Sequence, residues 1–415
     1  MDMITQNLRC LACDSEHVHL ALNLGMSPLA NAYKDTRDPV DERYPLAVNL
    51  CYECYHLQLS HTVDPGIIYK NYMYATGTNY TIQQYCEWFA NFVREYTETF
   101  DPAGQAVLDI GCNDGTQLNY FADLGYSTYG IDPAENLNNR IDKKHQAVCD
   151  FFGPAAVDEL KDIVHIRLFT DVYKVIVAQN VFAHNPNPLE FLLAAKELMS
   201  YPSYLFIQTS QADMVLHNEF DTIYHEHINF FNANSMSKLA KRAGMNLVDV
   251  IKTPIHGNSY IFVLRLSPHN PYHVQNIIAM EAAAGLYKND TYSQWNRHVQ
   301  DNVHELVKQV DLYRSEGYHV VGYGAAAKGM TLINFSGLDL DFIIDDNPLK
   351  QGKFAPGTAI PIVSISELSK IPDYEHVLFI PLAWNFFGEI RHRIESCRQV
   401  NGDKFLSYFP KVTVL

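Results

Sequence analysis

Short apolar runs alternate with helical patterns through the middle of the chain. The runs have the length and the branched, aromatic content of buried strands, and polar helical segments separate them. They lie at residues 106–110, 128–131, 175–178 and 204–208, with a closing run at 259–266. This alternation predicts an α/β domain built on a doubly wound, mostly parallel sheet.

A second series of apolar runs follows near the C-terminus. Residues 271–316 have a polar helical pattern, and strand-like runs then appear at 319–323, 340–344 and 377–380. We expect these runs to form a second, smaller Rossmann-like domain.

The first hundred residues differ from both of these regions. Residues 1–64 show little helical periodicity and are rich in turn formers, which predicts a small loop-rich module. Within residues 65–100, aromatic and apolar side chains recur at helical spacing from Tyr85 to Tyr96, a stripe typical of a core-facing helix. The predicted domains are therefore residues 1–64, 65–268 and 269–415.

Composition narrows the class of protein. The chain has 415 residues with 47 acidic against 31 basic side chains, and its formal charge of -16 argues against a nucleic acid partner. Neither a secretory leader nor an apolar stretch long enough to cross a bilayer is evident. We expect a cytoplasmic protein without a membrane partner.

Four of the eight cysteines form two CxxC pairs. Cys10 and Cys13 make the first pair, and Cys51 and Cys54 make the second. This spacing lets four thiolates surround one tetrahedral ion, so we expect structural zinc, with a redox pair or unrelated buried thiols as the alternative. A closed four-sulfur shell leaves no position open for catalysis.

A glycine-rich turn follows the first predicted strand of the middle domain. The segment Leu108-Asp-Ile-Gly-Cys-Asn-Asp-Gly115 departs from GxGxxG, which favours S-adenosylmethionine over a dinucleotide. Asp132 lies at the end of the next predicted strand, where its carboxylate can accept hydrogen bonds from the ribose hydroxyls of the cofactor. The alternative is a plain glycine turn capped by aspartate. The expected cofactor-binding residues are Asp109, Gly111, Asn113, Gly115, Asp132, Asp150, Phe151, Asn180 and His184.

The C-terminal domain has its own glycine-rich turn, Gly322-Tyr-Gly-Ala-Ala-Ala-Lys-Gly329. Backbone N–H groups at a helix start favour phosphate, and Lys328 supplies a countercharge. We therefore expect a nucleotide diphosphate near Gly324, Lys328 and Lys350, while a purely structural Rossmann turn is the alternative. His256 and Gly257 are expected to border the cleft between the two α/β units, although a structural turn explains that histidine equally well.

These motifs together resemble those of sugar C-methyltransferases that act on nucleotide-linked 4-keto deoxysugars. The resemblance spans the whole chain. It rests on the CxxC pairs with Leu24-Gly-Met-Ser-Pro-Leu29, the cofactor turn, Phe220-Asp-Thr-Ile-Tyr-His-Glu-His227, His256-Gly257 and the C-terminal glycine turn.

The resemblance implies S-adenosylmethionine-dependent methylation at C3 of a dTDP- or GDP-linked 4-keto-6-deoxyhexose. It assigns His227 as the base that removes the proton and so forms an enolate. Glu226 would orient or polarise that histidine, and Tyr224 would hold the sugar near its keto oxygen. Tyr74 is favoured over Tyr72 as a further active-site tyrosine. His225 replaces an aspartate found in one branch of the family, which leaves its role undefined.

Three alternatives compete with this interpretation. Methylation at C5 also proceeds through an enolate, and a non-catalytic sugar-nucleotide-binding zinc protein would keep the same binding motifs. A nicotinamide-dependent oxidoreductase is disfavoured by the incomplete dinucleotide fingerprint at Gly322-Tyr-Gly324. A zinc-bearing RNA methyltransferase is disfavoured by the negative charge.

Overall fold

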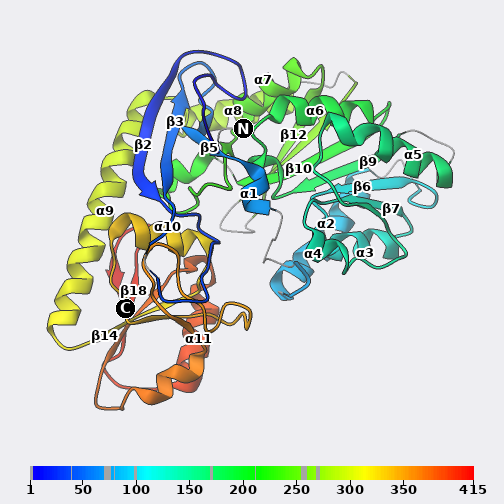
Figure 1. Ribbon diagram of the computed structural model, residues 1–415. Helices are drawn as coiled ribbons and strands as arrows, with labels where there is room; N and C mark the ends of the chain where they lie inside the picture. Colours follow the sequence, from blue (N-terminus) through cyan, green and yellow to red (C-terminus); the bar gives the residue numbers. More distant parts are fainter. Residues whose placement is uncertain are drawn as a thin grey trace.

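The computed structural model describes residues 3–38, 40–69, 76–78, 80–97, 101–168, 172–210, 212–253, 259–267 and 272–415. Three sheet-containing regions are visible in Figure 1, with the long helix α9 (Asn289–Ser315) along one side. Among the described residues, no helix combines the length and the apolar character needed to cross a bilayer.

The largest sheet has seven strands in the order β12-β13-β10-β9-β6-β7-β8. Strands β8, β7, β6, β9 and β10 run parallel, and β13 is antiparallel to both β10 and β12. In chain order they are β6 (Ala106–Ile110), β7 (Ser127–Ile131), β8 (Gln146–Val148), β9 (Val175–Gln179), β10 (Tyr204–Ser210), β12 (Asn246–Thr253) and β13 (Ser259–Arg265). The strand order reverses between β6 and β9, the position where doubly wound sheets bind ligands.

Successive strand residues bury their side chains on opposite faces of this sheet. Leu108 and Ile176 pack in one apolar cluster, whereas Val107 and Val175 pack in another with Phe89. The helices of this region are α2 (Tyr80–Tyr96), α3 (Thr116–Asp123), α4 (Glu135–Asn138), α5 (Val157–Leu168), α6 (Pro188–Glu197), α7 (Ala233–Arg242) and α8 (Tyr272–Ala283). Both faces are covered, as the apolar strand pattern requires.

The aromatic stripe on α2 is only partly core. Phe89 and Val93 are fully buried, but Trp88 is 44% exposed and stacks on Phe92 at a ring-centroid distance of 5.3 Å. The expectation that the whole stripe is buried is therefore wrong for Trp88, because helical spacing alone does not locate the edge of the covered face.

The N-terminal region contains more strand than its turn-rich sequence indicates. A four-stranded antiparallel sheet orders its strands β11-β4-β3-β2, and a separate two-stranded ladder joins β1 to β5. The strands are β1 (Ile4–Gln6), β2 (Val18–Ser27), β3 (Tyr44–Cys51), β4 (Leu57–Leu59), β5 (His61–Val63) and β11 (Asn229–Phe230). The prediction of a loop-rich module is corrected here, since two register shifts between β2 and β3 break the regular alternation that marks a strand.

The C-terminal sheet has six strands in the order β16-β15-β14-β17-β18-β19. All neighbours are parallel except β18 and β19. The elements are β14 (His319–Tyr323), α10 (Ala327–Ser336), β15 (Phe342–Ile344), β16 (Ile362–Val363), β17 (Val377–Pro381), α11 (Phe387–Cys397), β18 (Lys404–Ser407) and β19 (Thr413–Val414). The predicted second Rossmann-like sheet is confirmed.

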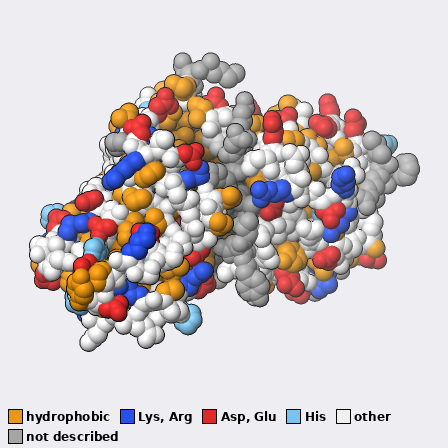
Figure 2. All heavy atoms as spheres, turned by 60° about the horizontal axis from the view of Figure 1, so that its bottom comes forward, with side chains coloured by type: hydrophobic (Ala, Val, Ile, Leu, Met, Phe, Trp, Pro, Cys, Tyr) orange, Lys and Arg blue, Asp and Glu red, His pale blue; other side chains and the backbone are white. Residues whose placement is uncertain are grey.

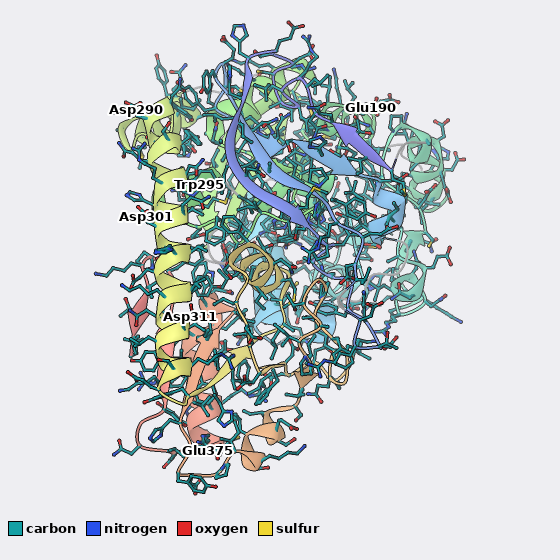
Figure 3. The ribbon with its side chains drawn as sticks, turned by 60° about the vertical axis from the view of Figure 1, so that its left-hand side comes forward. Glu190, Asp290, Trp295, Asp301, Asp311 and Glu375 are labelled. Carbon is teal, nitrogen blue, oxygen red and sulfur yellow. The ribbon has the colours of Figure 1, made fainter. Side chains whose placement is uncertain are left out.

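One apolar cluster joins the N-terminal sheet, the segment from Phe220 to Ile228, α9 and the C-terminal sheet. On α9, Tyr292, Trp295, Val299, Leu306 and Val310 are buried at helical spacing. Figure 3 shows Trp295 on this helix, and its indole N–H donates to the Glu219 carbonyl at 2.9 Å. The surface seen in Figure 2 carries interspersed acidic and basic side chains. The shared core fixes the N-terminal and C-terminal regions against the segment that carries Tyr224-His-Glu-His227, which we call the YHEH motif.

Candidate functional site

The four cysteines of the CxxC pairs converge. Their sulfur atoms all lie within 4.8 Å of one another, with Cys10 Sγ 3.5 Å from Cys54 Sγ and Cys13 Sγ 3.6 Å from Cys51 Sγ. A tetrahedral zinc ion with bonds of about 2.3 Å separates its sulfurs by about 3.8 Å, so the observed spacing fits zinc.

Two similar turns bring the thiols together. Asp14 and Tyr55, the residues after each pair, adopt φ angles of 67° and 58° and donate their N–H groups to the carbonyls of Cys10 and Cys51 at 2.8 Å. All four cysteines are free thiols, and three of them are buried. The predicted zinc site is therefore formed by the fold, in a closed shell that has a structural role.

The glycine turn after β6 lies at the reversal point of the large sheet. Gly111 has a φ of 76°, and a Cβ there would lie 2.9 Å from the Val181 side chain, so a larger residue does not fit. Asp132 holds the turn in place: its two carboxylate oxygens each accept a backbone N–H at 2.9 Å, from Asn113 and from Ala134. Burial raises the pKa of Asp132 and, far more strongly, that of Asp109 beneath the turn.

The other predicted cofactor residues border the same edge of the sheet. Phe151, which is 41% exposed, lines a cavity of about 340 Å³ together with Asn185 and Phe191. Asp150 accepts the Phe151 N–H at 2.7 Å, and Asn180 directly follows β9 with a φ of 53°. An exposed aromatic face beside buried carboxylates and a glycine turn suits an adenosine-type cofactor.

The YHEH motif places a tyrosine and a histidine in direct contact. Tyr224 Oη lies 2.7 Å from His227 Nε2, and His227 Nδ1 lies 2.9 Å from the Thr222 carbonyl oxygen. Because a carbonyl only accepts, His227 carries a proton on Nδ1, and in the neutral ring Nε2 is the basic atom. Tyr224 then donates to Nε2, and burial raises its pKa well above the usual value, which keeps it a donor.

His184 lies beside this pair, which its assignment as a cofactor residue did not anticipate. Its ring centroid is 5.2 Å from that of His227, and the Tyr69 ring also stacks on it at 5.7 Å. Burial lowers the pKa of His184 to about 4, so its imidazole is neutral at physiological pH. A neutral neighbour does not oppose a positive charge that forms on His227.

The other two members of the motif are buried as well. Glu226 is 4% exposed, and its Oε1 accepts from Asn31 Nδ2 at 2.6 Å. His225 is 2% exposed, it meets the edge of the Tyr44 ring, and the backbone of Tyr44 and Pro45 lies close to its imidazole. His225 therefore packs against the N-terminal sheet, away from the Tyr224–His227 contact.

Asn31 and Tyr33 are site residues that sequence reasoning missed. Tyr33 donates its hydroxyl to the Ala325 carbonyl at 2.6 Å, in the glycine turn after β14. Lys350 Nζ donates to the same carbonyl at 2.6 Å. The only sequence signal was the Asn-Ala-Tyr-Lys stretch that follows Leu24-Gly-Met-Ser-Pro-Leu29, and it predicts no contact with the two distant motifs.

The C-terminal glycine turn is tightly packed. Gly324 has a φ of 92°, and a Cβ on it would lie 2.8 Å from the Ala383 Cβ. Lys328 Nζ donates to Asn385 Oδ1 at 2.9 Å and lies 4.9 Å from the Trp384 ring centroid. Burial lowers the pKa of both Lys328 and Lys350, while nearby carboxylates oppose that shift. Both lysines thus contact this protein's own groups.

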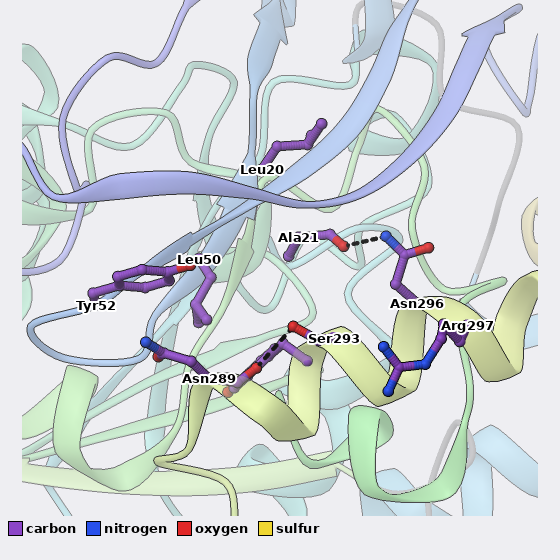
Figure 4. A pocket seen from close by; sticks show the side chains of 9 residues that line it. Leu20, Ala21, Leu50, Tyr52, Asn289, Ser293, Asn296 and Arg297 are labelled. Atoms are coloured by element: carbon purple, nitrogen blue, oxygen red, sulfur yellow. Dashed lines mark hydrogen bonds between the residues drawn. The ribbon is translucent and has the colours of Figure 1, made fainter.

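Three predicted site residues, Tyr74, His256 and Gly257, lie outside the residues that the structure describes. A second cavity of about 340 Å³ lies between α9 and the N-terminal sheet. Figure 4 shows its lining, in which Asn296 donates to the Ala21 carbonyl at 2.8 Å. None of the predicted catalytic or cofactor residues lines this cavity.

Three protein families match successive parts of the chain. Residues 10–69 match a zinc binding domain, residues 80–250 a methyltransferase domain, and residues 254–410 a C-methyltransferase C-terminal domain. The C-methyltransferase NovU of Streptomyces niveus is 28% identical over a 429-residue alignment that covers 100% of this chain and 98% of that protein.

Other similarities cover less than half of the chain. The ubiquinone biosynthesis O-methyltransferase of Glaesserella parasuis serovar 5 is 31% identical over 110 residues, which cover 26% of this chain and 45% of that protein. The structure of magnesium protoporphyrin IX methyltransferase from Synechocystis, with bound SAM, has a TM-score of 0.33, 14% identity, and covers 45% of this chain and 79% of that one.

The family matches agree with what the fold contains: a four-cysteine centre, a doubly wound sheet with a cofactor turn, and a further sheet domain at the C-terminus. The NovU match extends over all three regions in one alignment. The domain matches and the full-length similarity to NovU together identify this protein as an S-adenosylmethionine-dependent C-methyltransferase related to NovU.

Proposed function

We propose that this enzyme methylates C3 of a dTDP- or GDP-linked 4-keto-6-deoxyhexose through an enolate. The observation that carries the proposal is the Tyr224–His227 contact, in which a histidine with a fixed proton on Nδ1 presents its basic Nε2 to a tyrosine hydroxyl 2.7 Å away. A base beside a hydrogen-bond donor is what proton removal next to a ketone requires.

In the proposed reaction, the 4-keto oxygen takes the hydrogen bond that Tyr224 now donates to His227. His227 Nε2 is then free to accept the proton from C3, and the Tyr224 hydroxyl stabilises the negative charge that develops on oxygen. The imidazolium that forms keeps its Nδ1 hydrogen bond to the Thr222 carbonyl. The buried Glu226 carboxylate orients the sugar and offsets the positive charge of the imidazolium.

S-adenosylmethionine, when bound, supplies an electrophilic methyl group for the nucleophilic carbon. The residues proposed to hold it are Asp109, Gly111, Asn113, Gly115, Asp132, Asp150, Phe151 and Asn180. Asp132 already fixes the glycine turn, and Phe151 offers an apolar face for a purine. The neutral His184 stands between this edge of the sheet and His227.

The nucleotide is proposed to lie at the glycine turn after β14, near Gly324. The start of α10 has no side-chain cap, so its N–H groups are available for an anion. Lys328 and Lys350 are buried beside this turn and add positive potential there. Because the Ala325 carbonyl contacts Tyr33, the nucleotide and the sugar would be bound by the same group of residues.

The test combines the protein with S-adenosylmethionine and freshly made dTDP- or GDP-4-keto-6-deoxyhexoses in deuterated water. We expect the wild type to add one methyl group, detected by mass spectrometry, and to incorporate deuterium at C3. His227→Asn should lose both reactions, whereas His304→Asn, at an exposed position on α9, should keep both.

Three outcomes would contradict parts of the proposal. Methylation assigned by NMR to C5 would move the reacting carbon, and unchanged exchange in His227→Asn would remove the base assignment. Absence of both reactions over the panel of sugars would reject this substrate class.

A further inference from the structure

The segment at residues 30–34, in the connection between β2 and β3 of the zinc-bearing module, contacts two sites that are far apart in the sequence. Asn31 contacts Glu226, 195 positions later, and Tyr33 contacts Ala325, 292 positions later. The backbone of Lys34 also forms an isolated antiparallel β-bridge with Phe354. The segment therefore lies against both the YHEH motif and the C-terminal glycine turn.

We propose that Asn31 is a positioning residue that holds the Glu226 carboxylate in its ionised, working orientation. The inference rests on the proposed function, because it assigns Asn31 a role through Glu226. Glu226 is 4% exposed, and a buried carboxylate is unfavourable unless donors reach it. The Asn31 amide supplies one such donor, at 2.6 Å from Oε1.

Chemistry fixes which way the Asn31 amide points. An ionised carboxylate only accepts hydrogen bonds, so the NH2 group of Asn31 must face Glu226 and the amide oxygen must face the other way. That oxygen lies 3.5 Å from the Tyr33 hydroxyl, whose proton goes to the Ala325 carbonyl at 2.6 Å. Lys350 donates to the same carbonyl and lies 5.1 Å from the centroid of the Tyr33 ring.

This arrangement connects the proposed nucleotide site to the reacting end of the sugar. The Ala325 carbonyl belongs to the turn that is proposed to meet the diphosphate, and Glu226 belongs to the motif that is proposed to meet the ring. A donor to the charged form of a carboxyl group lowers its pKa, so loss of Asn31 should raise the pKa of Glu226. The carboxylate would also lose a constraint on its rotation, and a displacement of about 1 Å in a site can lower the rate about 100-fold.

Two substitutions separate positioning from mere packing. Asn31→Ala removes the donor, whereas Asn31→Asp keeps the shape and places a second carboxylate against Glu226. We expect both to lower kcat about 10- to 100-fold with a much smaller change in KM. The Asp variant should lose more activity at pH 8 than at pH 6, because two adjacent carboxyl groups share a proton more readily at the lower pH.

A matched control is Asn296→Ala. Asn296 also donates an amide hydrogen bond to the N-terminal region, at 2.8 Å to the Ala21 carbonyl, but its partner lies on β2 and not in the YHEH motif. We expect this variant to keep the wild-type kcat and pH profile, and all variants to keep bound zinc. Wild-type kcat and pH profile in both Asn31 variants would overturn the proposal.

The wild-type reaction distinguishes the two hypotheses. If the wild type methylates a nucleotide sugar but the Asn31 variants behave normally, only the Asn31 inference fails. If the wild type methylates none of the sugars, the proposed function fails, and Asn31 is then judged by a double-mutant cycle of unfolding with Asn31→Ala and Glu226→Gln. Additive effects in that cycle overturn the contact, and a coupling between the two changes supports it.

Discussion

His225 offers a quantitative test of how the segment with the YHEH motif packs on the N-terminal sheet. Its imidazole is 2% exposed, and burial lowers its pKa from 6.5 to about 4, with the backbone of Tyr44 and Pro45 opposing part of that shift. In the unfolded chain the same group titrates near its usual value of about 6.5. Between pH 6.5 and pH 4 the unfolded state therefore binds more protons, so stability is fully present above this window and falls as the pH decreases through it.

The size of the effect follows from the two pKa values. Each pH unit well inside the window changes the free energy of unfolding by about 1.4 kcal/mol, and partial titration near pH 6.5 reduces the loss between pH 6.5 and pH 4.5 to about 2 kcal/mol. His225→Phe abolishes this contribution. It also places an apolar ring against Tyr44, in a buried position that favours an uncharged side chain.

The measurement is urea unfolding of the zinc-loaded protein at several pH values from 4.5 to 7.5. We expect His225→Phe to be at least as stable as the wild type at pH 7.5 and to gain about 2 kcal/mol relative to it by pH 4.5. His304→Phe, at an exposed position on α9, should follow the wild-type curve. A difference between His225→Phe and wild type that does not change with pH would refute the reasoning.

Further predictions concern the metal, the cofactor turn and a second buried titratable group, Glu219. Cys51→Ser should abolish stoichiometric zinc, measured by atomic absorption, because three sulfurs no longer close the shell, whereas Cys397→Ser, at an exposed thiol, should retain it. Asp132→Ala should weaken S-adenosylmethionine binding in calorimetry at least about 10-fold, because the turn loses two hydrogen bonds as well as the proposed ribose contact, and unchanged affinity would remove Asp132 from the site. Burial raises the pKa of Glu219 to about 8, so the folded state binds the extra proton and wild-type stability falls as the pH rises from 4.5 to 8. Glu219→Gln should therefore gain about 2 kcal/mol relative to wild type between pH 6 and pH 7.5, and a constant difference in unfolding free energy would contradict this.

The sequence predicted the central strands of the two Rossmann-like sheets because these strands are buried on both faces. The runs at 106–110, 175–178 and 319–323 match β6, β9 and β14 within a residue. Strand β12 was not predicted, because Asn246–Thr253 mixes polar and apolar side chains. A register shift between Leu247 and Asp249 also interrupts its alternation. The N-terminal strands were hidden for the same physical reason.

In the candidate site as well, some contacts could be predicted from the sequence and others could not. Tyr224 and His227 are three residues apart, and Cys10 and Cys13 are equally close, so local spacing was enough to predict that each pair shares one site. The position of His184 beside His227 depends on how the loop after β9 meets the YHEH segment, which no local pattern encodes. The Asn31–Glu226 contact has the same origin, because its partners are 195 positions apart and neither belongs to a periodic pattern that predicts the other.

The structural role of the zinc-bearing module follows from the segments that its chain brings together. The four-cysteine centre holds the start of β2 and the end of β3, and the connection between these strands contains Asn31 and Tyr33. Strand β11, which follows the YHEH motif directly, completes the same sheet by pairing with β4. A metal that performs no chemistry therefore fixes two parts of the candidate active site at once: the loop that contacts Glu226 from one side and the strand that anchors the motif from the other. Both contacts converge on the segment that carries Glu226, which gives the structural metal module a place beside the candidate site.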